Sequence, residues 1–228
     1  MFYDFTNLTK TLDSYLDIGV PFYDCIVMKD GKSVYHNMNG FTDAARKIRP
    51  NGKELYNIYS CSKLITCVAA LQLLEKSAFR LDDNLSEYMP EFSDMSVRTE
   101  SGLVKSKNPI RILNLFTMTA GFSYDTHSPW LEKCREETAG ACPTREVMKY
   151  LANEPLWFEP GERWAYSLCH DVLAALIEVV SGQKFGDYVQ DHIFDPLKMN
   201  NSTFKRKKFG VEKIVNQFKY DTETKTCF

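Results

Sequence analysis

Hydrophobic and polar positions alternate along this chain in two ways, which predict two kinds of element. Residues 23–29 and 33–38 have the character of strands, and Asp30-Gly31 between them is a two-residue turn signal. Together they predict a β-hairpin over residues 23–38. Further along, apolar positions recur three or four residues apart, as in helices with one buried face. The helices predicted in this way cover about residues 9–18, 62–76, 110–118, 144–153, 173–182 and 185–193.

The remaining segments are predicted from their polarity and their turn residues. Residues 43–53 and 93–108 are polar and are expected to be loops, the second of them mobile. Residues 123–142 are expected to be irregular. Residues 211–219 are predicted as a strand, followed by a hairpin turn over 221–225.

This order, with strands at the two ends and helices between them, favours an α+β fold. We expect one domain over residues 1–228, in which a helical region at 54–204 is inserted between the halves of an antiparallel sheet. Only the hairpin at 23–38 contains convincing strands, and an isolated hairpin is marginally stable. The sheet is therefore expected to be incomplete within these residues, with its C-terminal strands missing.

Composition places the chain among ordinary globular proteins, because 44% of its residues are hydrophobic and 25% are charged. A net charge of -2 argues against nucleic acid or an acidic membrane surface as a partner. We expect neither a secretory leader nor a membrane span, since no run approaches ~20 apolar residues. The basic run at 205–208 is short and is interpreted as a solvated loop.

The seven cysteines are odd in number and irregularly spaced, without a C-x-x-C pair. This pattern indicates a reducing compartment and therefore a cytoplasmic protein. It predicts no metal site, and no cofactor is expected. A loop disulfide between Cys134 and Cys142 remains an alternative.

The candidate chemistry lies in the pattern S-x-x-K, which occurs at Ser60, Ser181 and Ser202. Ser181 precedes Gly182 at the predicted end of a helix, which is typical of a capping turn, and Ser202 lies in a polar run. Only Ser60 opens a long apolar helix. Residues three apart share a helix face, so Lys63 is expected to reach the Ser60 hydroxyl.

A serine hydroxyl needs a base to take its proton, and lysine is a base only when it is neutral. Lowering a lysine pKa from about 10.4 to about 7 costs on the order of 4–5 kcal/mol. Burial can shift a pKa this far, and apolar Leu64, Val68 and Leu71 are expected to surround Lys63. The alternative is that Ser60 only caps the helix and that Lys63 is solvated.

Tyr166 is the third candidate, because a tyrosine hydroxyl can relay a proton between Ser60, Lys63 and a leaving group. With these residues in place, the sequence resembles the serine β-lactamase and penicillin-binding-protein superfamily. It is most similar to the branch of class C β-lactamases, DD-peptidases and related esterases. Five ordered segments carry the resemblance: the hairpin 25–38, SCSK at 60–63, IRILNLFTMTAG at 110–121, FEPGERWAYS at 158–167 and IFDPLKMNNSTF at 193–204.

The resemblance implies a β-lactamase/transpeptidase-like fold and a serine hydrolase that cleaves a small ester, amide or peptide through an acyl-enzyme. It implies Ser60 as the nucleophile, Lys63 as the general base and Tyr166 as the third catalytic group. The family's Tyr-x-Asn is here a Tyr-x-Leu that ends at Leu168, so the amide is lacking. His170 is a weaker candidate for substrate binding and is more typical of a structural histidine.

The family's third motif, Lys-Thr-Gly or His-x-Gly, is absent. The sequence KTC at 225–227 comes nearest but follows Tyr166 too closely, and a Tyr-x-Asn at 35–37 lies too early. These departures keep three alternatives open: a non-catalytic binding or regulatory module, a homo-oligomer that pairs through an open sheet edge, and a nucleophile elbow at Ser123.

Overall fold

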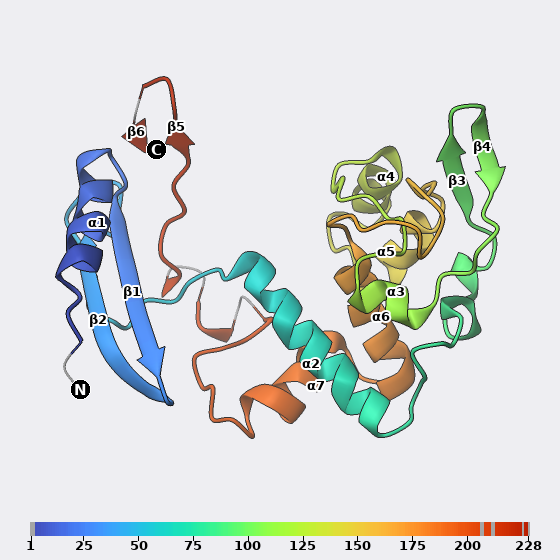
Figure 1. Ribbon diagram of the computed structural model, residues 1–228, viewed down its shortest axis with the longest axis horizontal. Helices are drawn as coiled ribbons and strands as arrows, with labels where there is room; N and C mark the ends of the chain where they lie inside the picture. Colours follow the sequence, from blue (N-terminus) through green and yellow to red (C-terminus); the bar gives the residue numbers. More distant parts are fainter. Residues whose placement is uncertain (1–2, 206–207, 211–212, 225, 228) are drawn as a thin grey trace. The chain divides into compact units, whose positions relative to one another are not determined.

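The computed structural model describes residues 3–205, 208–210, 213–224 and 226–227. The chain divides into two compact units, one made of Met1–Asn57 with Arg206–Phe228 and the other of Ile58–Lys205 (Figure 1). The first unit contains the N-terminal hairpin. The second contains nearly all the helices, together with every candidate catalytic residue.

The first unit is built on the predicted hairpin, which is confirmed. β1 (Phe22–Lys29) pairs antiparallel with β2 (Lys32–Gly40). The turn residues Asp30 and Gly31 both have positive φ, as a two-residue turn of this kind requires.

α1 (Thr6–Asp17) packs on β2, where the hydroxyls of Thr9 and Tyr35 lie 2.9 Å apart. The helix begins three residues before its predicted start. The Asp4 carboxylate accepts a hydrogen bond from the backbone N–H of Thr6 at 2.9 Å and so satisfies an otherwise free donor of the first turn.

The described C-terminal residues of this unit, 208–210, 213–224 and 226–227, are mostly irregular. β5 (Tyr220–Asp221) and β6 (Thr226–Cys227) form a short antiparallel hairpin, which agrees with the predicted turn. The strand predicted at 211–219 is wrong for the residues that are described, 213–219, because only Ile214 forms a bridge there, to Leu55. Residues 211, 212 and 225 of these two predictions lie outside the described residues, as do 206 and 207 of the basic run.

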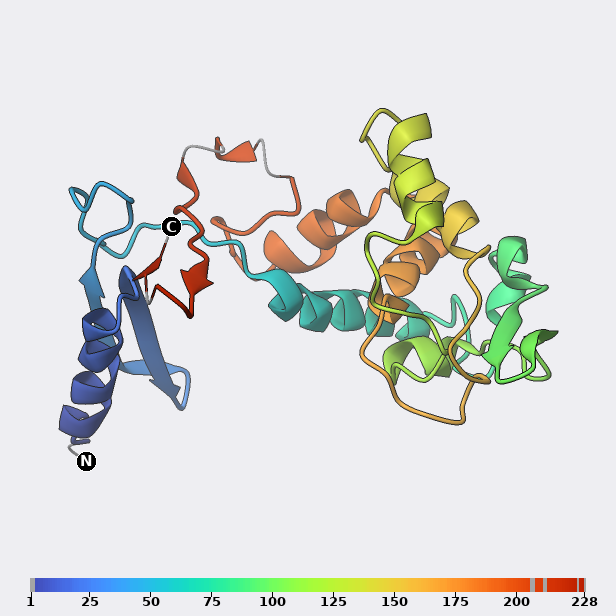
Figure 2. The same cartoon turned by 90° about the horizontal axis from the view of Figure 1, so that it is seen from above.

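The second unit is organised around two long helices. α2 (Ser62–Glu75) and α6 (Cys169–Ser181) pack against each other, as Figures 1 and 2 show. Seven residues of α6 are buried, namely Cys169 and all six residues from 172 to 177. Burial on every face of this part of the helix explains its continuous apolar sequence. Gly182 ends α6 with a φ of 70°, and this confirms the predicted C-cap.

The shorter helices of this unit are α3 (Ile112–Phe116), α4 (Pro129–Glu137), α5 (Thr144–Leu151) and α7 (Phe185–Val189), which continues as a π-helical turn over Gln190–Phe194. Three of them lie within predicted helices. α4 falls in the segment predicted to be irregular. Its start signal was present in the sequence, because Ser128 caps the helix by accepting a hydrogen bond from the Leu131 N–H and Pro129 occupies the first position.

A second hairpin replaces the mobile loop that was predicted at 93–108. β3 (Ser96–Thr99) pairs antiparallel with β4 (Gly102–Lys105). Val97 is buried and also bridges Leu156, whereas β4 is exposed along its whole length. The polar sequence therefore reflects an exposed hairpin and not an absence of structure.

Among the described residues, helices and three two-stranded antiparallel sheets confirm the predicted α+β class. Within the described part of the chain, no helix combines the length and the apolar character that crossing a bilayer requires.

Candidate active site

Ser60 lies in a short 3-10 turn, Tyr59–Cys61, that leads into α2, and its side chain is exposed. Lys63 follows in the first turn of α2, with its Nζ 3.5 Å from the Ser60 Oγ. The expected contact between these two side chains is therefore confirmed. Tyr59, directly before the serine, has a φ of 43°, a region that costs a residue other than glycine of order 1–3 kcal/mol.

Tyr166 reaches the same hydroxyl from a distant part of the sequence, and its Oη donates a hydrogen bond of 2.5 Å to the Ser60 Oγ. Backbone hydrogen bonds hold the tyrosine there by joining segment 118–123 to segment 157–168. The donors are the N–H groups of Trp157, Gly161, Ala165 and Leu168, and the acceptors are the carbonyls of Gly121, Thr119, Met118 and Ser123 in that order. A side chain at Gly121 would prevent this pairing, because its Cβ would lie 2.4 Å from the Phe158 carbonyl.

Two aromatic rings face the Lys63 ammonium group. Its Nζ lies 4.9 Å from the centroid of the Tyr166 ring and 5.3 Å from that of Tyr124. The two rings pack edge to face at 4.8 Å. Contacts of this kind favour a positive charge. Tyr124 had no role in the sequence prediction.

The apolar surround expected for Lys63 is absent. Leu64, Val68 and Leu71 are 69%, 38% and 45% exposed. The residues of α2 that are buried, Thr66, Ala69, Ala70 and Leu73, occupy a different face of the helix. The prediction that these three side chains keep Lys63 dry is therefore wrong.

The electrostatics also differ from the prediction. Burial lowers the pKa of Lys63, but the hydrogen bond to Tyr166 and the charge interactions with Tyr124 and Asp171 outweigh it, so this pKa is raised. The pKa of Tyr166 is lowered, because hydrogen bonding with Ser60 and with Lys63 and the Lys63 charge favour its deprotonated form. These shifts do not favour a neutral Lys63, so its role as general base stays a prediction.

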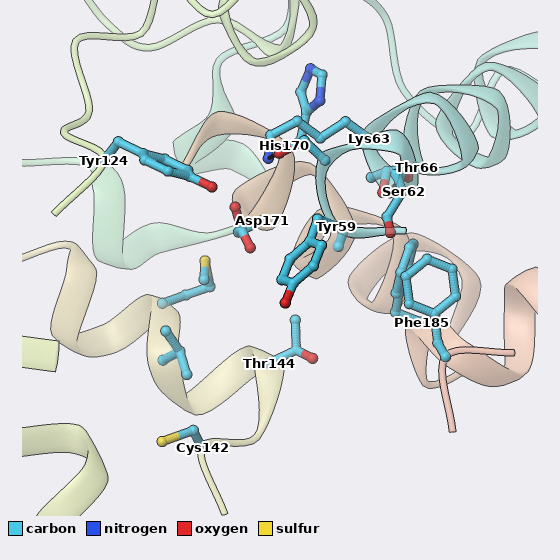
Figure 3. A pocket seen from close by; sticks show the side chains of 15 residues that line it. Tyr59, Ser62, Lys63, Thr66, Tyr124, Cys142, Thr144, His170, Asp171 and Phe185 are labelled. Atoms are coloured by element: carbon cyan, nitrogen blue, oxygen red, sulfur yellow. Dashed lines mark hydrogen bonds between the residues drawn. The ribbon is translucent and has the colours of Figure 1, made fainter. Parts of the chain in front are cut away.

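A pocket of about 480 Å³ opens beside Ser60 and Lys63 (Figure 3). Its wall is formed by residues of α2, α5, α6 and α7 and of the segments next to them. Part of the wall is apolar, from Val147, Met148, Ala174, Phe185 and Phe204. Such a mixture of apolar surface and a few polar groups is typical of small-molecule sites.

Asp171 is the second charged residue of the pocket wall, and the sequence gave no reason to select it. It lies in the first turn of α6. Its side chain is exposed and its carboxylate opens onto the pocket. Partial loss of solvent around the carboxylate raises the pKa of Asp171, although the charges of Lys63 and His170 oppose the shift.

His170, the weaker candidate, also lies in the pocket wall. Its Nε2 is 3.4 Å from the carbonyl oxygen of Phe116 and 3.6 Å from the Sγ of Cys67. Burial lowers the pKa of His170 and keeps the ring neutral at pH 7. These contacts favour the structural role over a contact with substrate.

Leu168, which stands where the family has Asn, is the N-cap residue of α6 and is buried. It is not among the residues that line the pocket. The Oγ of Ser123 accepts a hydrogen bond from the Asp125 N–H at 3.3 Å, as in a local turn. The decoy Tyr-x-Asn at 35–37 lies on β2, in the first unit.

All seven cysteines are free thiols, so the alternative disulfide between Cys134 and Cys142 is absent. Among the described residues, no three histidine, cysteine or acidic side chains are grouped so that they could hold a metal ion.

Comparison with known proteins places this geometry in a family. The family model described as "Beta-lactamase" matches residues 19–221. The chain therefore belongs to the beta-lactamase family, as the five sequence segments indicated.

Individual relatives are similar over most of this chain. A lovastatin esterase of Penicillium rubens is 31% identical over 191 residues, which are 79% of this chain and 47% of that protein. Esterase EstB of Burkholderia gladioli is 31% identical over 196 residues, 78% of this chain and 46% of that protein. The chain thus spans about half the length of the curated relatives it matches.

The solved structure of "EstCE1, a hydrolase with promiscuous acyltransferase activity" superposes with a TM-score of 0.81. The superposition covers 97% of this chain and 57% of that one, at 24% identity. This likeness shows the fold, which is the β-lactamase/transpeptidase-like fold expected from the sequence.

Proposed function

We propose that this chain is a serine hydrolase that transfers the acyl group of a small ester or amide first to Ser60 and then to water. One observation carries the proposal: the exposed Ser60 Oγ is contacted by both the Tyr166 hydroxyl, at 2.5 Å, and the Lys63 ammonium, at 3.5 Å. A serine that receives two such partners at the edge of a pocket has the arrangement of an activated nucleophile.

The directions of the two pKa shifts support one assignment of roles to the two partners. In this assignment Tyr166 acts in its deprotonated form as the general base that accepts the Ser60 proton while the Oγ attacks the substrate carbonyl. Lys63 remains protonated and stabilises that phenolate. Tyr166 then gives the proton to the leaving group, and it activates the water that hydrolyses the acyl-enzyme. The resemblance implied the reverse assignment, with Lys63 as the base.

An ester is the favoured substrate, because both relatives at 31% identity are named as esterases and part of the pocket wall is apolar. The seven free thiols, with Cys61 exposed, support a reducing, cytoplasmic setting. Pairing of two copies through the open sheet edge stays a prediction, which size-exclusion chromatography tests.

Hydrolysis of 4-nitrophenyl butyrate by the wild-type chain and by the Ser60→Ala variant tests the proposal. We expect the variant to lose on the order of 10³-fold or more in kcat/KM. A stoichiometric burst of nitrophenol should precede steady turnover if the acyl-enzyme accumulates.

Equal rates for the two proteins would instead support a non-catalytic binding module. One observation favours that second candidate: Leu168 is buried and leaves no amide where the family has one. Circular dichroism of both proteins must show the same fold for the comparison to count.

A further inference from the structure

The pocket wall contains one charge that the proposed chemistry does not use. Of its two charged residues, Lys63 is held by Ser60 and by the rings of Tyr124 and Tyr166. Within the described part of the chain, the Asp171 carboxylate has no salt bridge and no side-chain hydrogen bond to another residue, and Lys63 acts on it only through its charge. This exposed carboxylate is therefore open to a further cation in the pocket.

The surroundings of Asp171 indicate what could supply that cation. Figure 3 shows its carboxylate directed into the space that Tyr59 and Tyr124 also border. Tyr59 is 68% exposed and contributes an aromatic side chain to the wall. A carboxylate beside aromatic rings is the combination that attracts ammonium groups, through charge and through the ring faces.

We infer that Asp171 is a substrate-recognition residue that binds an ammonium group on the part of the substrate that enters this pocket. Because Lys63 repels a second cation, the ammonium lies on the Tyr59 side of the carboxylate. Ala174, one turn further along α6, continues the wall as an apolar surface. The substrate class is therefore a cationic acyl ester or amide with a short apolar chain. This inference rests on the proposed function and narrows its substrate.

Binding of choline and of its neutral isostere 3,3-dimethylbutan-1-ol tests the ammonium site without any chemistry. By titration calorimetry or NMR, we expect the wild-type chain to prefer choline on the order of tenfold. Asp171→Asn should remove the preference. Glu136→Gln, which removes an exposed carboxylate of α4 outside the pocket, should retain it. Equal binding of the two compounds, or an undiminished preference in Asp171→Asn, overturns the inference.

The same isosteric exchange can be made in a substrate. The 4-nitrophenyl esters of 4-(trimethylammonio)butanoate and of 5,5-dimethylhexanoate differ only by nitrogen in place of carbon. We expect the ratio of their kcat/KM values to favour the cationic ester in the wild type and to fall on the order of tenfold in Asp171→Asn. A ratio that is unchanged by the substitution contradicts the inference.

The salt dependence of choline binding replaces the variant if it does not fold, and ester hydrolysis separates a failure of the ammonium site from a failure of the hydrolase activity. If Asp171→Asn fails to fold, the wild-type preference for choline is measured between 10 mM and 1 M salt, where screening should weaken it; a preference that does not fall with salt rejects the ionic site. If choline is preferred but neither ester is hydrolysed, only the proposed hydrolase activity fails. If both esters are hydrolysed without a choline preference, only the ammonium site fails.

Discussion

Two S-x-x-K sequences in this chain lie at opposite ends of helices, and their serines have opposite environments. Ser60 precedes α2, is exposed, and has its Oγ within reach of Lys63 and Tyr166. Ser181 is the last residue of α6, and its Oγ donates a hydrogen bond of 2.6 Å to the Ile177 carbonyl. One hydroxyl is free to react, whereas the other completes the end of a helix.

The direction of the helix explains the difference. At the start of α2 the following residues are helical, so the side chain three positions on returns to the same face. At the end of α6 the free groups are carbonyls, which accept the serine proton. Gly182 then takes the chain out of the helix, and Lys184 leads into α7, exposed to solvent. The same four-residue pattern therefore has chemical meaning only at a helix start.

The largest expected difference in activity is between variants of Lys63 and of Lys184, the lysines of the two S-x-x-K sequences. We expect Lys63→Ala to lower kcat/KM for 4-nitrophenyl butyrate on the order of 10³-fold, since the cation that stabilises the Tyr166 phenolate is lost. Lys184→Ala is the matched control, because it removes the exposed lysine of the second sequence. Comparable losses of kcat/KM in the two variants would contradict the claim that only the S-x-x-K at Ser60 is catalytic.

Tyr166→Phe should come next, with a loss of about 10²–10⁴-fold in kcat/KM, the usual contribution of a general base. The ring remains to pack against Tyr124, so thermal unfolding should be nearly unchanged. Tyr15→Phe, which removes the hydroxyl of an exposed tyrosine of α1, is the control. A Tyr166→Phe variant with full activity would return the role of base to Lys63.

The dependence on pH distinguishes the two assignments in the wild type. The pKa of Tyr166 lies below its ordinary value of 10.0, and its active form is the deprotonated one, so kcat/KM should fall tenfold per unit as pH decreases below that pKa. Lys63 must stay protonated, and its pKa lies above 10.5, so no loss is expected before that value. Activity that still rises steeply above pH 10.5 would identify Lys63 as the base.

The smallest expected effect is on stability, and it concerns the S-x-x-K at Ser181 alone. Gly182→Ala should lower the free energy of unfolding by about 1 kcal/mol, because alanine is strained at a φ of 70° while a Cβ there meets no atom within 4 Å. Gly186→Ala is the control: its Cβ makes an ordinary contact with Phe204 at 3.4 Å, and its φ is not positive. Urea denaturation measures the free energy of unfolding of both variants. A Gly182→Ala chain as stable as the wild type would contradict the claim that the end of α6 requires glycine.

Local features were predictable from the sequence. The hairpin followed from Asp30-Gly31, the end of α6 from Gly182, and the contact of Ser60 with Lys63 from their spacing, since each depends on neighbouring residues only. The exposed hairpin β3–β4 was missed because few of its side chains are buried and no alternation marks it.

Features that depend on packing were not predictable. Leu64, Val68 and Leu71 are apolar, but apolar character does not reveal which faces of α2 are covered. Tyr124 and Asp171 reach the pocket because segment 118–123 pairs with segment 157–168 and α6 packs on α2. No spacing in the sequence connects them with Ser60, although Asp171 follows a histidine that was already considered.

Site-specific labelling by a fluorophosphonate probe tests the central claim most directly, because the probe reacts with activated serines and reports the residue by peptide mass. We predict one adduct per folded chain, on Ser60, with none on Ser181 or Ser202. Tyr166→Phe should slow the reaction. A folded chain that takes up no probe, or takes it up on another serine, would contradict the account.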